Sequence, residues 1–192
     1  TARPDDGFGF MDQHTRKTMQ KAGLGSATML LGDIFHVFPK SRVEKKKVKN
    51  FKDYARLYPE ASFSFVGDSG QQDTQVGLRM LQEFPERIRG VFVHNVTEVS
   101  PEIQEHLFDQ GIWHFDNYAD AARIALDKGL ISAEQAESIG AAAMRQFYDI
   151  QFTDLSQKEA LLKDLRSSCH RLSNSVTHAK QNSLPLYFQK AS

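Results

Sequence analysis

The sequence has little of three features that would place it in a special class of proteins. It has one cysteine, Cys169, so no internal disulfide can form and a secreted disulfide framework is excluded. No apolar run approaches the roughly 20 residues that a membrane-spanning helix needs. Neither sign of charge is in excess, because 24 Lys and Arg balance 24 Asp and Glu, which argues against a nucleic-acid binder. We therefore expect a globular, cytoplasmic protein.

The composition is that of an ordinary globular domain. Hydrophobic residues make up 40% of the 192 residues and charged residues 25%, which excludes wholesale disorder. The sequence becomes more polar and charged after Asp149. We predict a main domain over residues 1–150, followed by a helix and a polar tail over residues 151–192. The chain begins at Thr1 without a methionine or a signal-peptide pattern, so we expect it to be a piece of a longer protein.

Apolar runs of two kinds alternate along the main domain. Short continuous runs, typical of buried strands, cover residues 28–31, 62–66, 90–94 and 111–115. Apolar residues with helical spacing cover residues 10–21, 41–58, 73–84, 118–128, 133–148 and 155–172. Strands that are apolar throughout and separated by helices predict the α/β class, with a doubly wound parallel sheet and helices on both faces.

The richest candidate site follows the predicted strand over residues 62–66. The sequence Gly67-Asp68-Ser69-Gly70-Gln71-Gln72-Asp73 places two carboxylates around a glycine-containing turn, between a strand and a helix. Ligands of parallel sheets bind outside the carboxyl ends of the strands, and Mg²⁺ favours one or two carboxylates together with water and phosphate oxygens. We predict Asp68 and Asp73 as Mg²⁺ ligands. The alternative is that Asp68 is only a turn residue and that Asp73 is favoured at the start of its helix by the helix dipole.

Three other groups are candidates for contact with a phosphorylated substrate. Lys47, with Lys46 as the competing choice, begins the helix before the Asp68 strand and could offset phosphate charge; the alternative is a solvated charged face. Thr1 supplies a hydroxyl group and Arg3 supplies a positive charge two positions later. His94 ends a predicted strand, where it is either structural or part of a substrate pocket. No zinc spacing, P-loop or nucleophile elbow is present.

The order of these motifs carries a family resemblance. Thr-x-Arg-Pro at residues 1–4, a lysine at a helix start and a strand ending in Gly-Asp-Ser-Gly-x-x-Asp resemble the haloacid-dehalogenase superfamily of phosphatases. The sequences Phe-Ser-Phe-Val-Gly-Asp-Ser-Gly-Gln-Gln-Asp at 63–73, Phe-Pro-Glu-Arg-Ile at 84–88 and Val-Phe-Val-His-Asn-Val at 91–96 resemble the catalytic domain of actin-patch-type phosphatidate phosphatases.

The resemblance implies a role for each matching position. Thr1 would hydrogen-bond the transferring phosphoryl group, and Lys47 would steady the charge of the nucleophile and the phosphate. Asp68 would ligate Mg²⁺ and Asp73 would complete or support that site. We further expect substrate contacts from the residues Arg3, Ser69, Gly70 and His94. The implied reaction proceeds through an aspartyl-phosphate that water then attacks, so positioning and charge neutralisation supply most of the rate.

One element of the family pattern is missing from this sequence. The family's nucleophile lies in an Asp-x-Asp-x-Thr motif, and no such motif occurs in the chain. We expect that the first strand, with the nucleophile, lies upstream of Thr1, so that the parent protein is an enzyme and this fragment is inactive. The cap structure would then also lie elsewhere, with residues 32–40 as a candidate substrate-facing loop.

Two specific functions remain open from the sequence alone, and a third possibility is an α/β domain of unrelated function. The first is a Mg²⁺-dependent phosphatase whose substrate is phosphatidate or a soluble phosphomonoester, with peripheral membrane contact in the lipid case. The second is a non-catalytic module that binds lipid or protein and retains the phosphatase fold. The sequence shows no strong polybasic or amphipathic anchor for a membrane, so it does not decide between a lipid and a soluble substrate.

Overall fold

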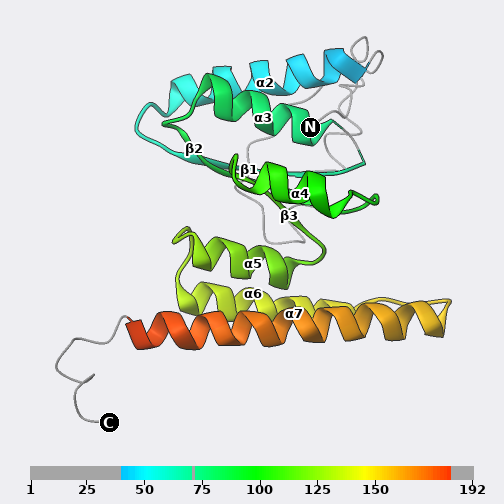
Figure 1. Cartoon of the computed structure of the whole chain (residues 1–192). Coiled ribbons are helices and arrows are strands. Elements are labelled where there is room, and N and C mark those ends of the chain that lie inside the picture. Colours follow the sequence, from blue (N-terminus) through cyan, green and yellow to red (C-terminus); the bar gives the residue numbers. More distant parts are fainter. Residues whose placement is uncertain (1–39, 71, 183–192) are drawn as a thin grey trace, which may run out of the picture. The chain divides into compact units, whose positions relative to one another are not determined.

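The structure is a computed structural model that describes residues 40–70 and 72–182 (Figure 1). Thr1, Arg3, the predicted helix over residues 10–21, the predicted strand over 28–31 and nearly all of the candidate loop over 32–40 lie outside the described residues. The chain divides into two compact units. The first comprises residues 1–91 and 110–112, and the second comprises residues 92–109 and 113–192.

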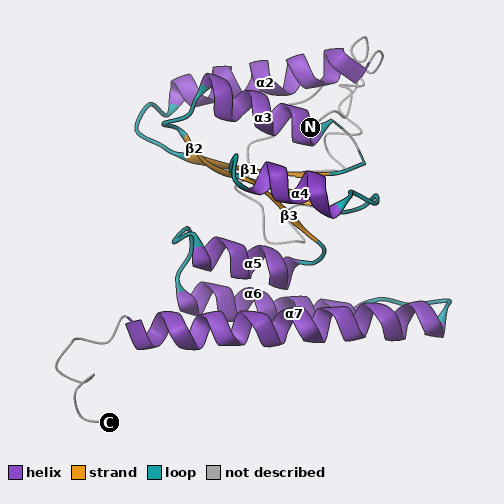
Figure 2. Cartoon of the chain, viewed as in Figure 1, coloured by secondary structure: helices purple, strands orange, loops and turns teal. Residues whose placement is uncertain are grey.

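A small parallel sheet is formed by the strands β1 (Phe63–Asp68), β2 (Ile88–His94) and β3 (Ile112–Phe115), in that order (Figure 2). Helix α3 (Asp73–Glu83) connects β1 to β2, and helix α4 (Pro101–Phe108) connects β2 to β3. Parallel neighbours need such crossover connections, because the chain has to return to the same end of the sheet. The predicted α/β class is confirmed, and in the described part of the chain helices flank a parallel sheet of three strands.

In the first unit, helix α2 (Lys40–Leu57) packs along α3, as Figure 1 shows. Val48 of α2 and Val76 of α3 are both buried. The Phe51 ring meets the rings of Phe63 and Phe84 edge-on, with centroids 5.3 and 5.2 Å apart. Aromatic pairs of this geometry add to the stabilisation from burial, so Phe51 ties α2 to the start of β1 and to the end of α3.

The expectation that every strand is apolar and buried throughout is wrong for β1. Strand β2 is buried at five of its seven positions, but β1 alternates between half-buried and exposed residues along most of its length. Val66 is 59% exposed. Exposed and half-buried side chains alternate because successive residues of a strand point to opposite faces, and one face of β1 is better covered than the other.

Arg87 fixes the end of α2, a role that the sequence did not reveal. Its guanidinium donates hydrogen bonds to the backbone carbonyls of Ala61 and Tyr58, both at 2.7 Å, and of Ala55 at 3.3 Å. Arginine suits this place because the last carbonyls of a helix lack intrahelical partners and carry the negative end of the dipole. The side chain therefore sets the angle at which the chain leaves α2 and enters β1.

The second unit contains a layer of three helices, α5 (Tyr118–Asp127), α6 (Ala133–Asp149) and α7 (Leu155–Asn182), which pack on one another. A capping box starts α6, where Ser132 and Gln135 satisfy each other's backbone N–H groups. On the strand side, Phe92, Trp113 and Phe115 pack against α5. No helix in the described part of the chain combines the length and apolar character needed to cross a membrane.

Two elements of the second unit differ from the prediction. Helix α7 continues to Asn182 instead of ending at Leu172, because Val176 adds one more buried position to its apolar face. Helix α4 was not predicted, although Ser100 precedes it at the N-cap and proline occupies the first helical turn. That Ser-Pro-Glu start is a helix signal. It was overlooked because α4 buries only Leu107 and so has almost no apolar periodicity.

Candidate functional site

The candidate site of the first unit is built around Asp73, the first residue of α3. Asp73 is only 4% exposed. Its Oδ1 forms an ion pair with Lys47 Nζ, and its Oδ2 accepts a hydrogen bond from the backbone N–H of Asp68 at 3.2 Å. A buried carboxylate needs such partners, because an unpaired charge away from water is strongly unfavourable. One side chain thus joins α2, the end of β1 and the start of α3.

Gly67 makes this arrangement sterically feasible. A Cβ atom at position 67 would lie 2.5 Å from both Cβ and Oδ2 of Asp73. No side chain fits at that separation, so glycine is required where the β1 backbone passes the buried carboxylate. The absence of a side chain at position 67 therefore makes room for the Asp73 carboxylate.

The turn after β1 presents Asp68 at the strand's carboxyl end. Asp68 Oδ1 accepts a hydrogen bond from the backbone N–H of Gly70 at 2.9 Å, which closes a tight turn around Ser69. Asp68 and Ser69 are half-buried, and Gly70 is exposed. Within the described residues, no hydrogen bond is made by Asp68 Oδ2. This oxygen can therefore take a further ligand.

The structure separates the two lysine candidates. The Lys47 side chain is 16% exposed and reaches Asp73, whereas Lys46 pairs with neither carboxylate of the site among the described residues. Position 47 faces α3 because it lies one helical turn before Phe51, whose ring also packs inside the unit. Lys47, Asp68 and Asp73 are therefore brought together, with Ser69 and Gly70 in the adjoining turn.

The carboxylates differ in how well they suit a metal ion. Asp68 has an oxygen to offer, and a single carboxylate with water and phosphate oxygens is a usual donor set for Mg²⁺. Asp73 has both oxygens engaged, so it fits the supporting role better than that of a direct ligand. Among the described residues there is no group of three or more His, Cys, Asp or Glu that could hold a metal ion.

A groove of about 310 Å³ adjoins the ion pair between α2 and β1. Lys47 and Asp73 contribute to its wall, and the rest of its lining is mainly apolar and aromatic, from Phe51, Tyr54, Phe65, Val66 and Met80. A charged end beside an apolar trough matches a ligand with a polar head and an apolar body. The sequence did not predict this groove, since its residues come from three separate elements.

His94 lies in the second unit, whereas Asp73 lies in the first. Its Nε2 lies 3.1 Å from the backbone oxygen of Asp116, and its ring stacks on Phe115 with centroids 5.1 Å apart. These contacts at the ends of β2 and β3 explain the position of the His94 ring by local packing. The predicted substrate contact of His94 stays a prediction.

Beside His94 lies a hydrogen-bonded chain that the sequence analysis did not find. Asn95 Nδ2 donates to Asp116 Oδ1 at 2.8 Å, which turns Asn95 Oδ1 toward His114 Nδ1 at 2.7 Å. His114 therefore carries its proton on Nδ1, and its buried Nε2 has no partner within the described part of the chain. Burial lowers the pKa of His114 below 6.5, partly opposed by Asp116.

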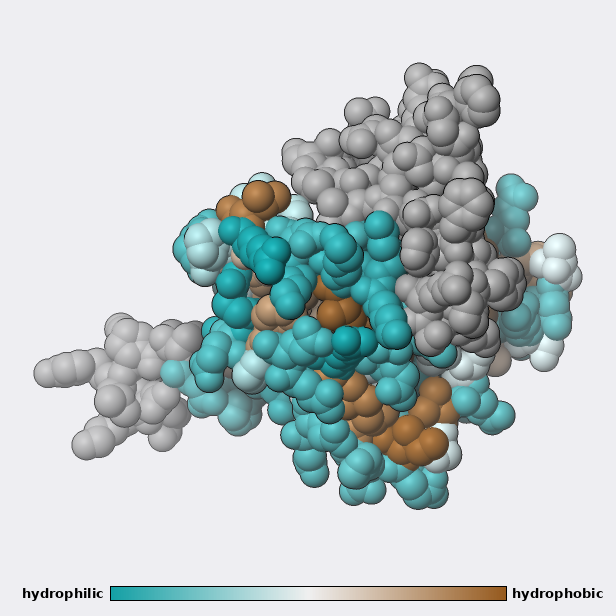
Figure 3. Space-filling view, turned by 90° about the horizontal axis from the view of Figure 1, so that it is seen from above, coloured by the Kyte–Doolittle hydropathy of each residue, from teal (hydrophilic) through white to brown (hydrophobic). Residues whose placement is uncertain are grey.

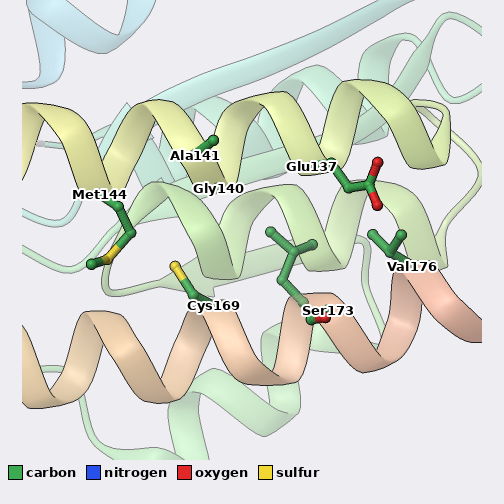
Figure 4. A pocket seen from close by; sticks show the side chains of 8 residues that line it. Glu137, Gly140, Ala141, Met144, Cys169, Ser173 and Val176 are labelled. Atoms are coloured by element: carbon green, nitrogen blue, oxygen red, sulfur yellow. The ribbon is translucent and has the colours of Figure 1, made fainter.

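A second groove, of about 230 Å³, lies between α6 and α7 (Figure 4). Met144 and Cys169 line it on facing helices, with Glu137 toward one end (Figure 4). Burial, with a contribution from Asp120, raises the pKa of the Cys169 thiol, so the thiolate needed for nucleophilic chemistry is disfavoured. This groove has no constellation of polar groups comparable with the one around Asp73.

The geometry defines an α/β protein with a lysine and two aspartates gathered at the carboxyl end of a parallel strand, an arrangement suited to handling phosphate esters. Residues 11–95 match the family described as phosphatidate phosphatase APP1, catalytic domain. The match covers less than half of the chain but contains Lys47, Asp68 and Asp73. It confirms the predicted resemblance to phosphatidate phosphatases and points to a phosphatase acting on a phosphorylated lipid. No curated protein and no solved structure matches the chain.

Proposed function

We propose that this chain is part of a Mg²⁺-dependent phosphatase that hydrolyses phosphatidate. The observation that carries the proposal is the joining of Lys47, Asp73 and Asp68 at the end of β1, inside the segment that matches the phosphatidate phosphatase family. A cation and carboxylates held at one strand end suit phosphoryl transfer, where positioning and charge neutralisation supply most of the rate.

Each residue has a distinct task under this proposal. Asp68 would hold Mg²⁺ through its available oxygen, and the ion would neutralise charge on the phosphoryl oxygens. Lys47 lies beside the same turn and places a positive charge where the phosphate would bind. Asp73 orients Lys47 and, through the backbone N–H of Asp68, fixes the end of β1. Ser69 and the backbone of Gly70 would contact the phosphate.

The lipid character of the substrate is supported by the groove beside the ion pair. The phosphate would bind near Lys47, and the apolar body of the lipid would lie along Phe51, Tyr54 and Phe65. A soluble phosphomonoester would not need this apolar lining.

The remaining parts of the mechanism follow the family. The haloacid-dehalogenase fold would extend the sheet beyond the three strands. An aspartate of an Asp-x-Asp-x-Thr motif would attack the phosphorus, the bond to the diacylglycerol oxygen would break, and diacylglycerol would leave as the protonated alcohol while the aspartyl-phosphate forms. That motif is not in this sequence, so the proposal places it upstream of Thr1 in the parent protein. Water would then hydrolyse the acyl-phosphate, which releases inorganic phosphate and regenerates the carboxylate.

The test is Asp68→Asn in the full-length parent protein, with phosphate release from phosphatidate as the measurement. We expect turnover to fall by at least about a thousand-fold, because a Mg²⁺ ligand and its charge are lost. Asp164→Asn, an exposed aspartate of α7, is the matched control and should retain full activity. Unchanged turnover in Asp68→Asn, with the control also active, would remove Asp68 from the mechanism.

The absence of an Asp-x-Asp-x-Thr motif favours a second candidate function. A module that keeps the phosphate-binding end of the sheet without a nucleophile would bind phosphorylated lipid or a protein and not hydrolyse it. Full-length parent protein that binds phosphatidate but releases no phosphate from it, with Mg²⁺ present, would establish this alternative.

A further inference from the structure

Helix α2 carries a large share of the positive charge of this neutral chain. It contains eight of the 24 Lys and Arg and only two of the 24 Asp and Glu, within 18 residues. The rest of the sequence consequently has an excess of acidic residues. Such segregation creates a local positive field that the net charge of zero conceals.

The structure shows which of these charges face solvent. Lys45, Lys49, Lys52 and Arg56 are all exposed, and their spacing of four, three and four residues places them in one row along α2. The row extends over about 16 Å of helix at 1.5 Å per residue. Asp53 is the acidic residue beside it, and it pairs with Lys49 at 2.5 Å and with Arg56 at 3.8 Å. Figure 3 views the side on which α2 lies in Figure 1, and the described surface there is mostly hydrophilic.

The row ends at two exposed apolar side chains. Leu57, the last residue of α2, is 72% exposed, and the Tyr58 beside it is 42% exposed. Arg87 holds the backbone at this point through the carbonyls of Ala55 and Tyr58, so the apolar tip is on a fixed support. A row of cations leading to an aliphatic and an amphipathic aromatic residue is the pattern of a surface that lies on a bilayer.

We propose that the exposed row of α2, with Leu57 and Tyr58 at its end, docks the protein on an anionic membrane surface. The lysines and the arginine would lie at the level of the acidic headgroups, and Leu57 would enter the boundary with the acyl chains. A nucleic acid fits less well, because the exposed apolar side chain of Leu57 would have no apolar surface to enter on a phosphate backbone.

This inference rests on the proposed function in one respect. It explains how a phosphatase without a membrane-spanning helix in its described part reaches a lipid that stays in the bilayer. It concerns solvent-facing residues of α2 that are different from Lys47, which faces α3. The docking surface and the phosphate site can therefore be tested separately.

The first test is co-sedimentation of the 192-residue chain with vesicles of phosphatidylcholine, with and without phosphatidylserine. Phosphatidylserine is a phosphodiester, so binding to it does not depend on phosphatase chemistry. We expect the chain to bind only the vesicles that contain phosphatidylserine, and we expect this binding to weaken as salt is added. Lys45→Gln/Lys49→Gln/Lys52→Gln should lower the partition coefficient about a hundred-fold.

The matched control removes three exposed cations of the second unit, Arg145, Lys163 and Arg166, by the same change to glutamine. It alters the net charge equally and should bind as the unchanged chain does. Thermal unfolding of both variants establishes that they are folded. Equal loss in both variants would show a general charge effect and overturn the proposal. So would full binding by the α2 variant, or tighter binding of the chain to an oligonucleotide than to the vesicles.

The apolar tip has its own control pair. Leu57→Ala should weaken binding to the anionic vesicles about ten-fold, because three buried carbons are lost from the interface. Leu155→Ala, at a residue 73% exposed, should leave binding unchanged. If Asp68→Asn has no effect on turnover but these binding results hold, the docking surface stands and the phosphatase proposal fails. The reverse pattern overturns the docking surface alone.

Discussion

Each compact unit contains a buried aspartate at the start of a helix, and the two aspartates have very different surroundings. Asp73 is 4% exposed and Asp120 is 8% exposed. Asp120 is held by Arg171 at 2.9 Å and by the Ser168 hydroxyl at 3.0 Å, and Asn117 donates to the same hydroxyl at 2.9 Å. Its partners are fixed side chains that connect α5 to α7.

In contrast, one carboxylate oxygen of Asp73 forms an ion pair with Lys47, and the other accepts a hydrogen bond from the backbone N–H of Asp68. It supports a neighbouring carboxylate that has an oxygen left for a ligand, beside a groove. Around Asp120 the polar groups satisfy one another, which is typical of a structural network. The comparison teaches that burial and a charged partner do not by themselves mark a site. A candidate site is marked instead by a neighbouring polar atom that can still bind a ligand.

The largest expected effect comes from removing the cation of each pair. Lys47→Met should lower the free energy of unfolding by about 3–5 kcal/mol, because Asp73 is left as a buried charge without its ion-pair partner. Arg171→Met should cost only about 1 kcal/mol, because the Arg171 side chain is half exposed and Asp120 keeps Ser168. Urea unfolding of both variants measures this. Equal losses would break the distinction between the two aspartates.

An intermediate effect is expected from one methyl group added in each unit. Gly67→Ala should lower the free energy of unfolding by about 1–3 kcal/mol, since the new Cβ meets Cβ and Oδ2 of Asp73 at 2.5 Å. Gly140→Ala, in α6, meets only the flexible Leu172 Cδ2 at 2.8 Å. Its gain in helix propensity of about 1 kcal/mol should offset that contact. A stable Gly67→Ala protein would show that Asp73 can move away from β1.

These glycines illustrate what the sequence could and could not reveal. Gly67, Asp68 and Asp73 stood out because a strand, a glycine turn and two carboxylates follow one another locally. The pairing of Asp73 with Lys47 joins residues 26 positions apart, and spacing along the chain predicted only that such a lysine could reach the crevice. Arg87 and the chain from Asn95 to His114 and Asp116 gave no local signal, because their partners come from other elements.

The smallest expected effect is a dependence of stability on pH, and it arises in the unit that contains Asp120. Burial lowers the pKa of His114 below 6.5 in the folded state, so the unfolded chain binds the proton first as the pH falls. The contribution of His114 to stability is therefore complete above about pH 6.5 and declines below that value, until the folded-state pKa is also passed. His114→Gln should flatten this decline in unfolding experiments at several pH values, whereas His170→Gln, at an exposed position, should not.

The sequence by itself determined the α/β class, the capping of α6 and the grouping of Asp68 with its glycine turn. These features arise from contacts within a few residues, so alternation, caps and turn residues reveal them. The tertiary structure alone decided that Lys47 and not Lys46 meets Asp73, that β1 is half exposed and that the cations of α2 form an exposed row. These depend on which face of each element is covered, and that is fixed only when elements distant in the sequence pack together.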